Sequence, residues 1–273
     1  VSYAAEFSLP GETLYGLKIN ITEPLRGAVK NNNEDQARWE SALVERRLAE
    51  AQLLADAGEL HNGKEDEIIK RINIQTAKAR ASVHMLSTID TLQATVLNSR
   101  LEASLSLHQQ YISDNITEGK ISASDRFEQS LELQASSTRA LGTELEADWE
   151  DQIDDQKATK ELEQSTKMLQ RRLDDNSQRL NQLNGREPGK KAQQDKVQQK
   201  INEAQKLISP KNMPNSTSTR AQSLSDLRQA LKLEREIYIL NQTKKKNDRS
   251  ILKSIHTDDD YNTESSGEEK SQD

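Results

Sequence analysis

The sequence contains no cysteine, and it is poor in residues that break helices or favour sheets. There are 5 prolines, 10 glycines, 2 tryptophans, 2 phenylalanines and 5 tyrosines among 273 residues. Without cysteine there is no disulfide framework, no thiolate metal site and no thiol nucleophile. The chain is instead rich in Ala, Leu, Glu, Gln, Lys and Arg, which favour helices, and 30% of its residues are charged. This composition predicts an all-α protein with long, solvated helices.

Apolar residues are also scarce. The hydrophobic set makes up 33% of the chain, whereas an average globular domain has about 45–50% when glycine is counted. A single large core is therefore not expected, and the favoured architecture is an elongated helical bundle. No apolar run reaches the ~18 residues of a membrane span, and no signal segment opens the sequence. Because the chain begins at Val1 rather than Met, we expect a missing N-terminal segment that could hold an anchor.

Motifs of catalysis and of cofactor binding are absent. The sequence has no Gly-x-Ser-x-Gly elbow, no phosphate loop, no dinucleotide-binding glycine pattern and no His-Glu-x-x-His pair. We therefore expect no enzymatic activity, no catalytic residue, no cofactor and no metal site, with a carboxylate-based hydrolase as a remote alternative. The net charge is −7, and no uniformly basic surface of the kind that binds nucleic acid is indicated.

Periodicity and turn signals divide the chain into six segments. The domain 34–150 is expected to hold three helices, one of which runs unbroken from about residue 63 to 112. The remaining boundaries follow from glycines, prolines and the acidic end. The segments are an N-terminal arm with short helices (1–33), a three-helix domain (34–150), a coiled-coil hairpin (151–208), a linker (209–219), a C-terminal helix (220–256) and a disordered acidic tail (257–273).

A heptad-like pattern lies within the expected hairpin. Apolar residues recur in alternating steps of four and three, which is typical of a coiled-coil seam. Asn176 falls on this seam and is predicted to fix the register of the pairing rather than to bind a ligand. The seam comprises Leu162, Leu169, Leu173, Asn176, Leu180 and Leu183 on the first helix and Val197, Ile201, Ala204 and Ile208 on the second.

Two short motifs stand near the N-terminus. The first is a Pro-Gly turn followed by a helix start, and the second lies inside the next long helix. We expect the ring of Tyr15 to pack on the first helices while its hydroxyl reaches a backbone group, and Arg47 to tie the N-terminal arm to that helix. The motif residues are Pro10, Gly11, Leu14, Tyr15 and Lys18 in the first and Arg46, Arg47, Leu48 and Glu50 in the second.

These motifs resemble those of an uncharacterised bacterial domain family with a Pro-Gly-acidic-x-Leu-Tyr-x-x-Lys opening and an Arg-Arg-Leu-x-Glu helix. The resemblance covers about residues 4–110. In that family the domain follows a signal peptide or a membrane helix, sometimes in proteins similar to anti-sigma factors. Glu12 stands where the family more often has Asp, and Gly16 where it often has Pro. The resemblance implies an extracytoplasmic helical domain of unknown activity.

The function expected from these observations is a non-catalytic, extracytoplasmic helical interaction or sensor module. It would be secreted, or tethered to a bacterial membrane through the missing N-terminal segment, and would contact a protein partner whose identity the sequence does not indicate. Nucleic acid is not an expected partner, and oligomer formation is left open. The alternative is a cytoplasmic coiled-coil scaffold.

Overall fold

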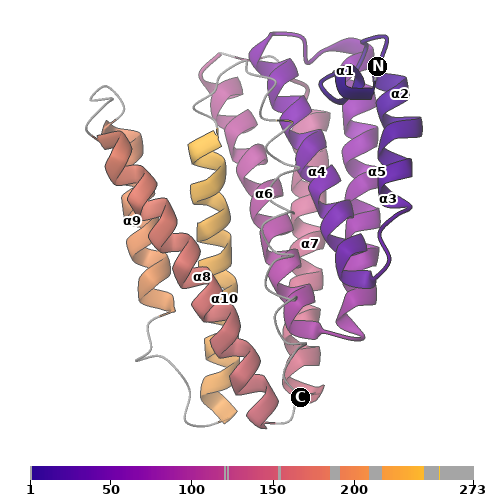
Figure 1. Ribbon diagram of the computed structural model, residues 1–273. Coiled ribbons are helices and arrows are strands. Elements are labelled where there is room, and N and C mark those ends of the chain that lie inside the picture. The colour runs from indigo at the N-terminus through magenta and orange to yellow at the C-terminus, as the bar shows by residue number, and fades with distance from the viewer. Residues whose placement is uncertain are drawn as a thin grey trace. The chain divides into compact units, whose positions relative to one another are not determined.

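The computed structural model describes residues 2–119, 121, 123–152, 155–184, 191–208, 217–242 and 252. Throughout this described part every regular element is a helix, so the all-α prediction is confirmed (Figure 1). Four short helices come first: α1 (Ser2–Glu6), α2 (Tyr15–Leu17), the π-helix η1 (Lys18–Thr22) and α3 (Glu23–Gly27). Seven long ones follow in the described residues: α4 (Asn33–Asp56), α5 (Asn62–Ser87), α6 (Thr91–Thr117), α7 (Asp125–Gln152), α8 (Asp155–Asn184), α9 (Lys191–Leu207) and α10 (Thr217–Gln242).

The chain divides into two compact units whose boundaries differ from the segments expected from sequence. The first unit contains Val1–Ser82, His108–Glu132 and Lys245–Asp273, and the second contains Val83–Leu107 and Leu133–Lys244. Each of α5, α6 and α7 therefore contributes residues to both units, which a segmentation along the sequence does not anticipate. The expected tail, 257–273, lies outside the described residues, as do residues 209–216 of the expected linker, whereas 217–219 already belong to α10.

The region expected to hold three helices holds four, because the segment taken as one helix is broken between α5 and α6. The carboxylate of Asp90 accepts a hydrogen bond from the backbone N–H of Gln93 at 2.8 Å and caps α6. The hydroxyls of Ser87 and Thr88 each donate to a carbonyl of α5 at 2.8 Å. Short polar side chains compete in this way with backbone hydrogen bonds, so a break needs no glycine. Ile89, which fits the apolar stripe, is 70% exposed.

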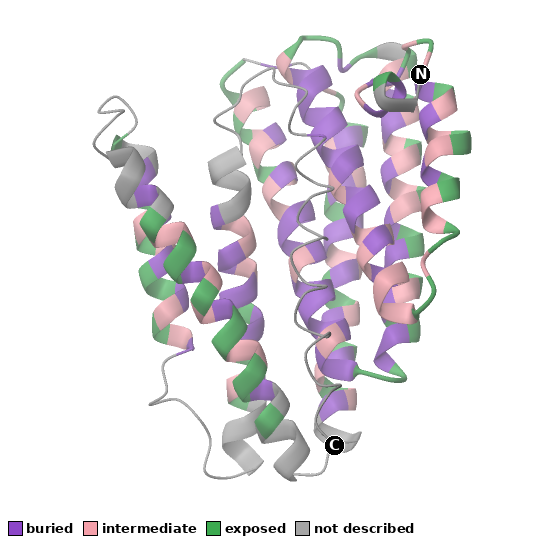
Figure 2. Cartoon of the chain, in the orientation of Figure 1, coloured by how far each residue is buried: buried purple, intermediate pink, exposed green. Residues whose placement is uncertain are grey.

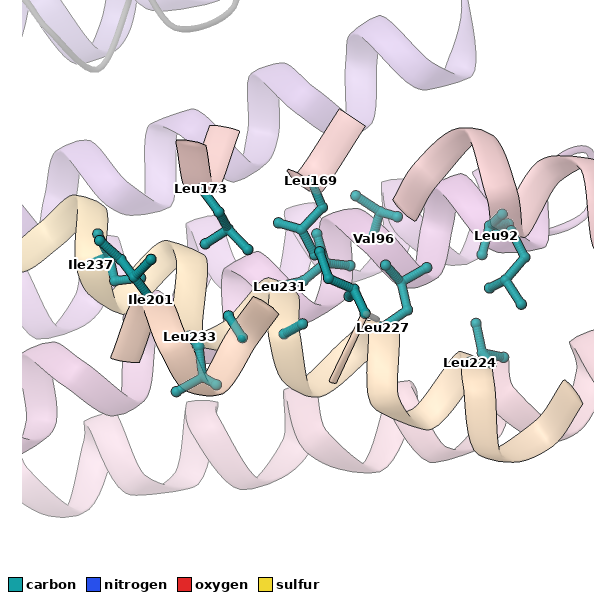
Figure 3. Packing of buried hydrophobic residues seen from close by; sticks show 14 of the residues in the cluster. Leu92, Val96, Leu169, Leu173, Ile201, Leu224, Leu227, Leu231, Leu233 and Ile237 are labelled. Carbon is teal, nitrogen blue, oxygen red and sulfur yellow. The ribbon is translucent and has the colours of Figure 1, made fainter. Parts of the chain in front are cut away.

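The core of the second unit is built mainly by α8, α9 and α10, which pack against one another (Figure 3). Leu169 and Leu173 of α8 and Ile201 of α9 all belong to this core. The third helix, α10, packs on both members of the expected hairpin, so the seam is shared among three helices. The buried residues of this core come from α6 (Leu92, Val96), α7 (Trp149), α8 (Leu162, Leu169, Leu173, Leu180), α9 (Val197, Ile201, Ala204, with Ile208 just beyond its end) and α10 (Leu224, Leu227, Ala230, Leu231, Leu233, Ile237).

In the first unit, α4 is buried on nearly every side (Figure 2). Between Ala42 and Ala55 every residue except Glu45 is buried. A helix that is buried all round is normally apolar all round. α4 instead carries Arg46, Arg47 and Glu50 in its buried part, so these charges must find partners inside the unit.

Candidate functional site

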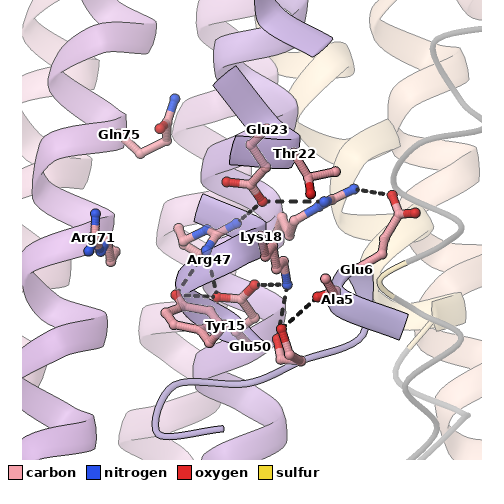
Figure 4. Close-up of polar contacts among 12 residues, drawn as sticks. Ala5, Glu6, Tyr15, Lys18, Thr22, Glu23, Arg47, Glu50, Arg71 and Gln75 are labelled. Atoms are coloured by element: carbon pink, nitrogen blue, oxygen red, sulfur yellow. Dashed lines mark hydrogen bonds and ion pairs between the residues drawn. The ribbon is translucent and has the colours of Figure 1, made fainter. Parts of the chain in front are cut away.

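A group of ionisable side chains joins the N-terminal short helices to α4, and we call it the N-terminal charge cluster. Both motifs predicted from sequence contribute to it, together with two acids that sequence reasoning did not select. Its seven members, Glu6, Tyr15, Lys18, Glu23, Arg46, Arg47 and Glu50, are all buried, and Figure 4 labels each of them except Arg46. Arg26 pairs with Glu6 at the edge of the cluster, and its side chain is 38% exposed.

Glu50 is the central acceptor of the cluster. One carboxylate oxygen pairs with the ammonium of Lys18, and both side chains are 0% exposed. The other oxygen accepts a hydrogen bond from the Tyr15 hydroxyl at 3.0 Å and lies 3.1 Å from a guanidinium nitrogen of Arg47. Lys18 also donates to the backbone carbonyl of Ser8 at 3.1 Å. One carboxylate of α4 therefore holds both functional groups of the first motif.

The two arginines of the second motif reach different parts of the N-terminal segment. Arg47 donates to the Tyr15 hydroxyl at 2.8 Å and pairs with Glu23. Arg46 lies 3.3 Å from Glu6 and 3.3 Å from Glu23. Arginine suits this task because its planar guanidinium donates in several fixed directions at once. Arg47 therefore contacts the N-terminal segment, as expected, and it does so through the side chains of Tyr15 and Glu23.

The position of Tyr15 corrects one expectation. Its hydroxyl lies between Glu50 and Arg47, donating to the first and accepting from the second, and its predicted bond to a backbone group is not among its partners. The ring lies beneath two cations, with Lys18 Nζ at 5.6 Å and Arg47 Cζ at 5.7 Å from its centroid. Tyr15 therefore bridges an acid and two bases, a role that neighbouring sequence positions do not reveal.

Burial and the neighbouring charges shift pKa values within the cluster. Desolvation lowers the pKa of Lys18, and the nearby charge of Glu50 offsets this only in part. Desolvation and then the negative charge of Glu50 raise the pKa of Tyr15 well above its ordinary range. For Arg47, burial lowers the pKa, but Glu50 and Glu23 outweigh burial and raise it overall. The cluster pairs three buried bases, Lys18, Arg46 and Arg47, with three buried acids, which are Glu6, Glu23 and Glu50.

The other residues of the two motifs shape the backbone around the cluster. Gly11 has a φ of +89°, which favours glycine, in the turn that precedes α2. Glu12 closes this turn by accepting from the backbone N–H of Leu9 at 3.0 Å. Pro10 and Leu48 are buried, and Leu14 is half-buried. Together they bring Tyr15 and Lys18 onto α4.

A further buried acid, Glu102, lies in the second unit and was not selected from sequence. It is 2.8 Å from Lys232 of α10, 3.0 Å from Arg139 of α7 and 3.2 Å from Arg228 of α10. Burial alone raises the pKa of Glu102, but the hydrogen bond from Lys232 and the surrounding positive charges outweigh burial and lower it. We call Glu102, Arg139, Arg228 and Lys232 the Glu102 cluster. No pattern in the sequence signals it, because Glu102 and Arg228 are 126 positions apart.

The predicted seam residues gather in the core of the second unit with two exceptions. Eight of them, from Leu162 to Ile208, belong to one buried cluster. Asn176 is only half-buried, so its predicted role in fixing the register stays a prediction. The side chain of Leu183 lies outside the described residues. The structure therefore shows that the predicted apolar seam is part of a core shared by three helices.

Comparison with known proteins finds a match to the region that holds every member of the N-terminal charge cluster except Glu6. Residues 8–118 match the model of a family described as Domain of unknown function (DUF5667). This supports the expected kinship with an uncharacterised domain. The matched stretch includes both motifs and runs from the N-terminal short helices to the end of α6. No curated protein and no solved structure matches the chain.

Among the described residues, no three or more acidic, histidine or cysteine side chains come together in a way that could hold a metal ion. Within the same part of the chain, no helix is both long enough and apolar enough to cross a bilayer.

Proposed function

We propose that this chain is a non-catalytic helical interaction module that acts outside the cytoplasm and presents helix surfaces to a protein partner. The observation that carries the proposal is the burial of the N-terminal charge cluster. Lys18 and Glu50 are paired with each other and are 0% exposed. A catalytic acid or base must come within hydrogen-bond reach of its substrate. Charges enclosed in this way instead hold one segment of the protein against another.

The arrangement of α4 supports the same interpretation. Its buried charges form ion pairs with segments 23 to 40 positions away in sequence, so they fix where the N-terminal segment lies. Buried ion pairs are weak sources of stability but can specify one arrangement among several. A surface that a partner must recognise needs such a defined arrangement. The location outside the cytoplasm is supported by the two motifs and the family to which they point.

Photo-crosslinking in the native cell tests the interaction. A photoreactive amino acid would replace an exposed residue at Ile89 or at Met168, which is 46% exposed. Replacement at the buried Leu173 provides the matched control. The proposal predicts that one and the same protein is captured repeatedly from at least one exposed position and not from the control. Failure to capture any protein from both exposed positions would overturn it.

Reporter fusions to the full native gene test the location. We expect a phosphatase that matures only outside the cytoplasm to be active when fused to the C-terminus. A fluorescent protein that matures only inside is expected to stay dark in the same position. The reverse result would overturn the extracytoplasmic location and favour the cytoplasmic scaffold.

A further inference from the structure

The outward side of residues 13–29 carries no charged side chain other than that of Arg26, which is 38% exposed and paired with Glu6. The exposed residues of η1, α3 and their neighbours are Thr13, Gly16, Asn20, Ile21, Pro24, Leu25, Ala28 and Val29. The segment has three charged residues, of which Lys18 and Glu23 are buried in the N-terminal charge cluster and Arg26 pairs with Glu6. The usual pattern of a surface helix, apolar side inward and charged side outward, is reversed here.

Three large aliphatic side chains form a ridge along this side. Ile21, Leu25 and Val29 are spaced four residues apart and are 50%, 66% and 68% exposed. The backbone N–H of Ala28 bonds to the carbonyl of Pro24 at 2.9 Å, so helical turns continue to the end of the ridge. Single exposed aliphatic residues are ordinary, but a contiguous apolar patch rimmed by polar residues marks an interaction site. We call Ile21, Leu25 and Val29 the apolar ridge.

We infer that the apolar ridge is where two copies of this chain associate, antiparallel, about a two-fold axis through Leu25. This inference deepens the proposed function and rests on it, since it names a partner for one surface. The ridge is symmetric in chemistry, with a β-branched residue four positions before Leu25 and another four positions after it. Antiparallel pairing places Ile21 of one copy opposite Val29 of the other. A two-fold interface requires this kind of self-complementarity.

Charge directs a second copy to the ridge rather than to the rest of the surface. The chain carries a net charge of −7, so two copies repel each other over most approaches. The ridge side brings only Arg26 near the contact, and its charge is paired with that of Glu6. A membrane is a poorer fit, because membrane-surface helices display Lys and Arg beside the apolar side. The two bases nearest the ridge are held elsewhere, Arg26 by Glu6 and Lys30 over the ring of Trp39 at 5.7 Å.

The size of the surface sets the expected strength. The helical residues of this segment, Tyr15–Gly27, span roughly 20 Å, and a helix is about 10 Å wide. Two such surfaces bury less than the ~800 Å² per partner of a standard interface, which corresponds to a weak and concentration-dependent dimer. The first experiment is therefore sedimentation equilibrium of the full chain from about 1 μM to 1 mM, a range that brackets weak association.

Leu25→Lys is the test variant and Ile89→Lys the matched control, because Leu25 and Ile89 are 66% and 70% exposed. A charge on the two-fold axis meets its own copy, so we expect Leu25→Lys to weaken self-association at least ~10-fold. Ile89→Lys is expected to leave it unchanged, and far-UV circular dichroism confirms that both variants fold. A wild-type chain that stays monomeric throughout, or equal effects of the two substitutions, would overturn the inference.

Disulfide trapping tests the geometry, since the chain has no cysteine of its own. Leu25→Cys places two thiols at the axis, within the ~4–7 Å between Cα atoms that a disulfide spans. We expect it to form covalent dimers at least ~10-fold faster than Ile89→Cys. A mixture of Ile21→Cys and Val29→Cys should give mainly the mixed disulfide. Dominance of the two self-disulfides in that mixture would overturn the antiparallel arrangement.

Flotation with phosphatidylcholine vesicles separates the membrane alternative. Vesicle binding that Leu25→Lys abolishes, in a chain that shows no self-association, would overturn the dimer and assign the ridge to lipid. These results are distinct from failure of the proposed function. A monomeric chain that still captures one protein from Ile89 or Met168 in the cell removes the dimer and retains the interaction module.

Discussion

The N-terminal charge cluster and the core of α8, α9 and α10 solve the same shortage of apolar residues in opposite ways. The core concentrates leucine and isoleucine in one place, and Leu173, Ile201 and Ile237 in it are 0% exposed. The N-terminal charge cluster buries three bases against three acids. Burial of apolar surface stabilises in proportion to area, whereas ion pairs lose much of their attraction to desolvation. The core should therefore supply stability and the cluster a defined arrangement.

Tryptophan fluorescence can follow the two regions separately. Trp39 lies in α4 of the first unit and Trp149 in α7 of the second, and both are buried. Variants that retain only one of the two tryptophans report the unfolding of their own unit in urea. The unfolding free energy of each variant is measured with the tryptophan of the unit that carries the substitution.

The largest effect is expected from a charge placed in the apolar core. Leu173→Asp removes a fully buried side chain and leaves a carboxylate without a partner, at a cost of more than about 4 kcal/mol in unfolding free energy. The loss should be seen by Trp149. Met168→Asp, at an exposed position of the same helix, is the control and should cost less than ~0.5 kcal/mol. Equal costs for the two variants would show that α8 does not bury its seam.

The second-largest loss of unfolding free energy is expected from breaking one ion pair of the N-terminal charge cluster. Glu50→Leu leaves Lys18 buried without its partner, which costs about 3–5 kcal/mol in comparable cases. Adding Lys18→Met should recover most of this loss, because Arg47 keeps Glu23 and the buried charges balance again. The readout is urea unfolding followed by Trp39. Glu34→Gln, at a side chain that is 45% exposed in its pair with Arg38, should cost less than ~0.5 kcal/mol.

The double variant decides what the cluster contributes. Recovery of stability with a loss of structural definition, seen as faster amide hydrogen exchange in α2 and η1, would assign the cluster to specificity. A double variant as unstable as Glu50→Leu alone would contradict this assignment and show that the ion pair itself stabilises the unit.

Glu102 provides a smaller effect that depends on pH. Its pKa is lowered in the folded protein, so its contribution to stability is present above the unfolded pKa, ordinarily 4.5, and is lost as the pH falls toward the folded pKa. We expect Glu102→Gln to cost roughly 2–3 kcal/mol at pH 7. The difference from the wild type should shrink steadily below about pH 4.5. A difference that is constant from pH 7 to pH 3, in urea unfolding followed by Trp149, would contradict this.

Gly142 should give the smallest loss. An ideal Cβ at this position of α7 would lie 2.7 Å from Arg228 Cζ and 2.8 Å from Asn98 Nδ2. Ala ordinarily favours a helix over Gly by about 1 kcal/mol, but the clash is expected to reverse the sign and cost about 1–2 kcal/mol. Gly63→Ala in α5, where nothing lies within 4 Å, should cause no loss. Stabilisation by Gly142→Ala would mean that Arg228 moves aside freely.

Local pattern was a reliable guide to the helices and less so to their ends. Gly58 and Gly119, which lie just beyond the ends of α4 and α6, carry φ values of +69° and +68°, as the expected glycine boundaries require. The break after Ser87 escaped notice because it depends on Asp90 as a cap, and Ile89 maintained the apolar spacing across it. Periodicity measures which residues are apolar, and it does not register a side chain that competes for backbone hydrogen bonds.

The residues of the candidate site were likewise predicted only in part. Both motifs were visible in the sequence, and Arg47 was expected to tie the N-terminal arm to the helix. Glu6 and Glu23 were not selected, although they pair with Arg46 and Arg47. An acid in a chain with 30% charged residues has no local mark that distinguishes a buried position from a solvated one.

The sequence by itself determined that this protein is helical, where its apolar stripes lie and which two short motifs set its N-terminal region apart. These properties follow from neighbouring residues, because helix formation and amphipathicity are local. Only the tertiary structure decided which charges are buried and with which partners, from Lys18 with Glu50 to Arg228 with Glu102. The reason is that desolvation and ion pairing depend on the segments that surround a charge, and those segments come together only when the chain is folded.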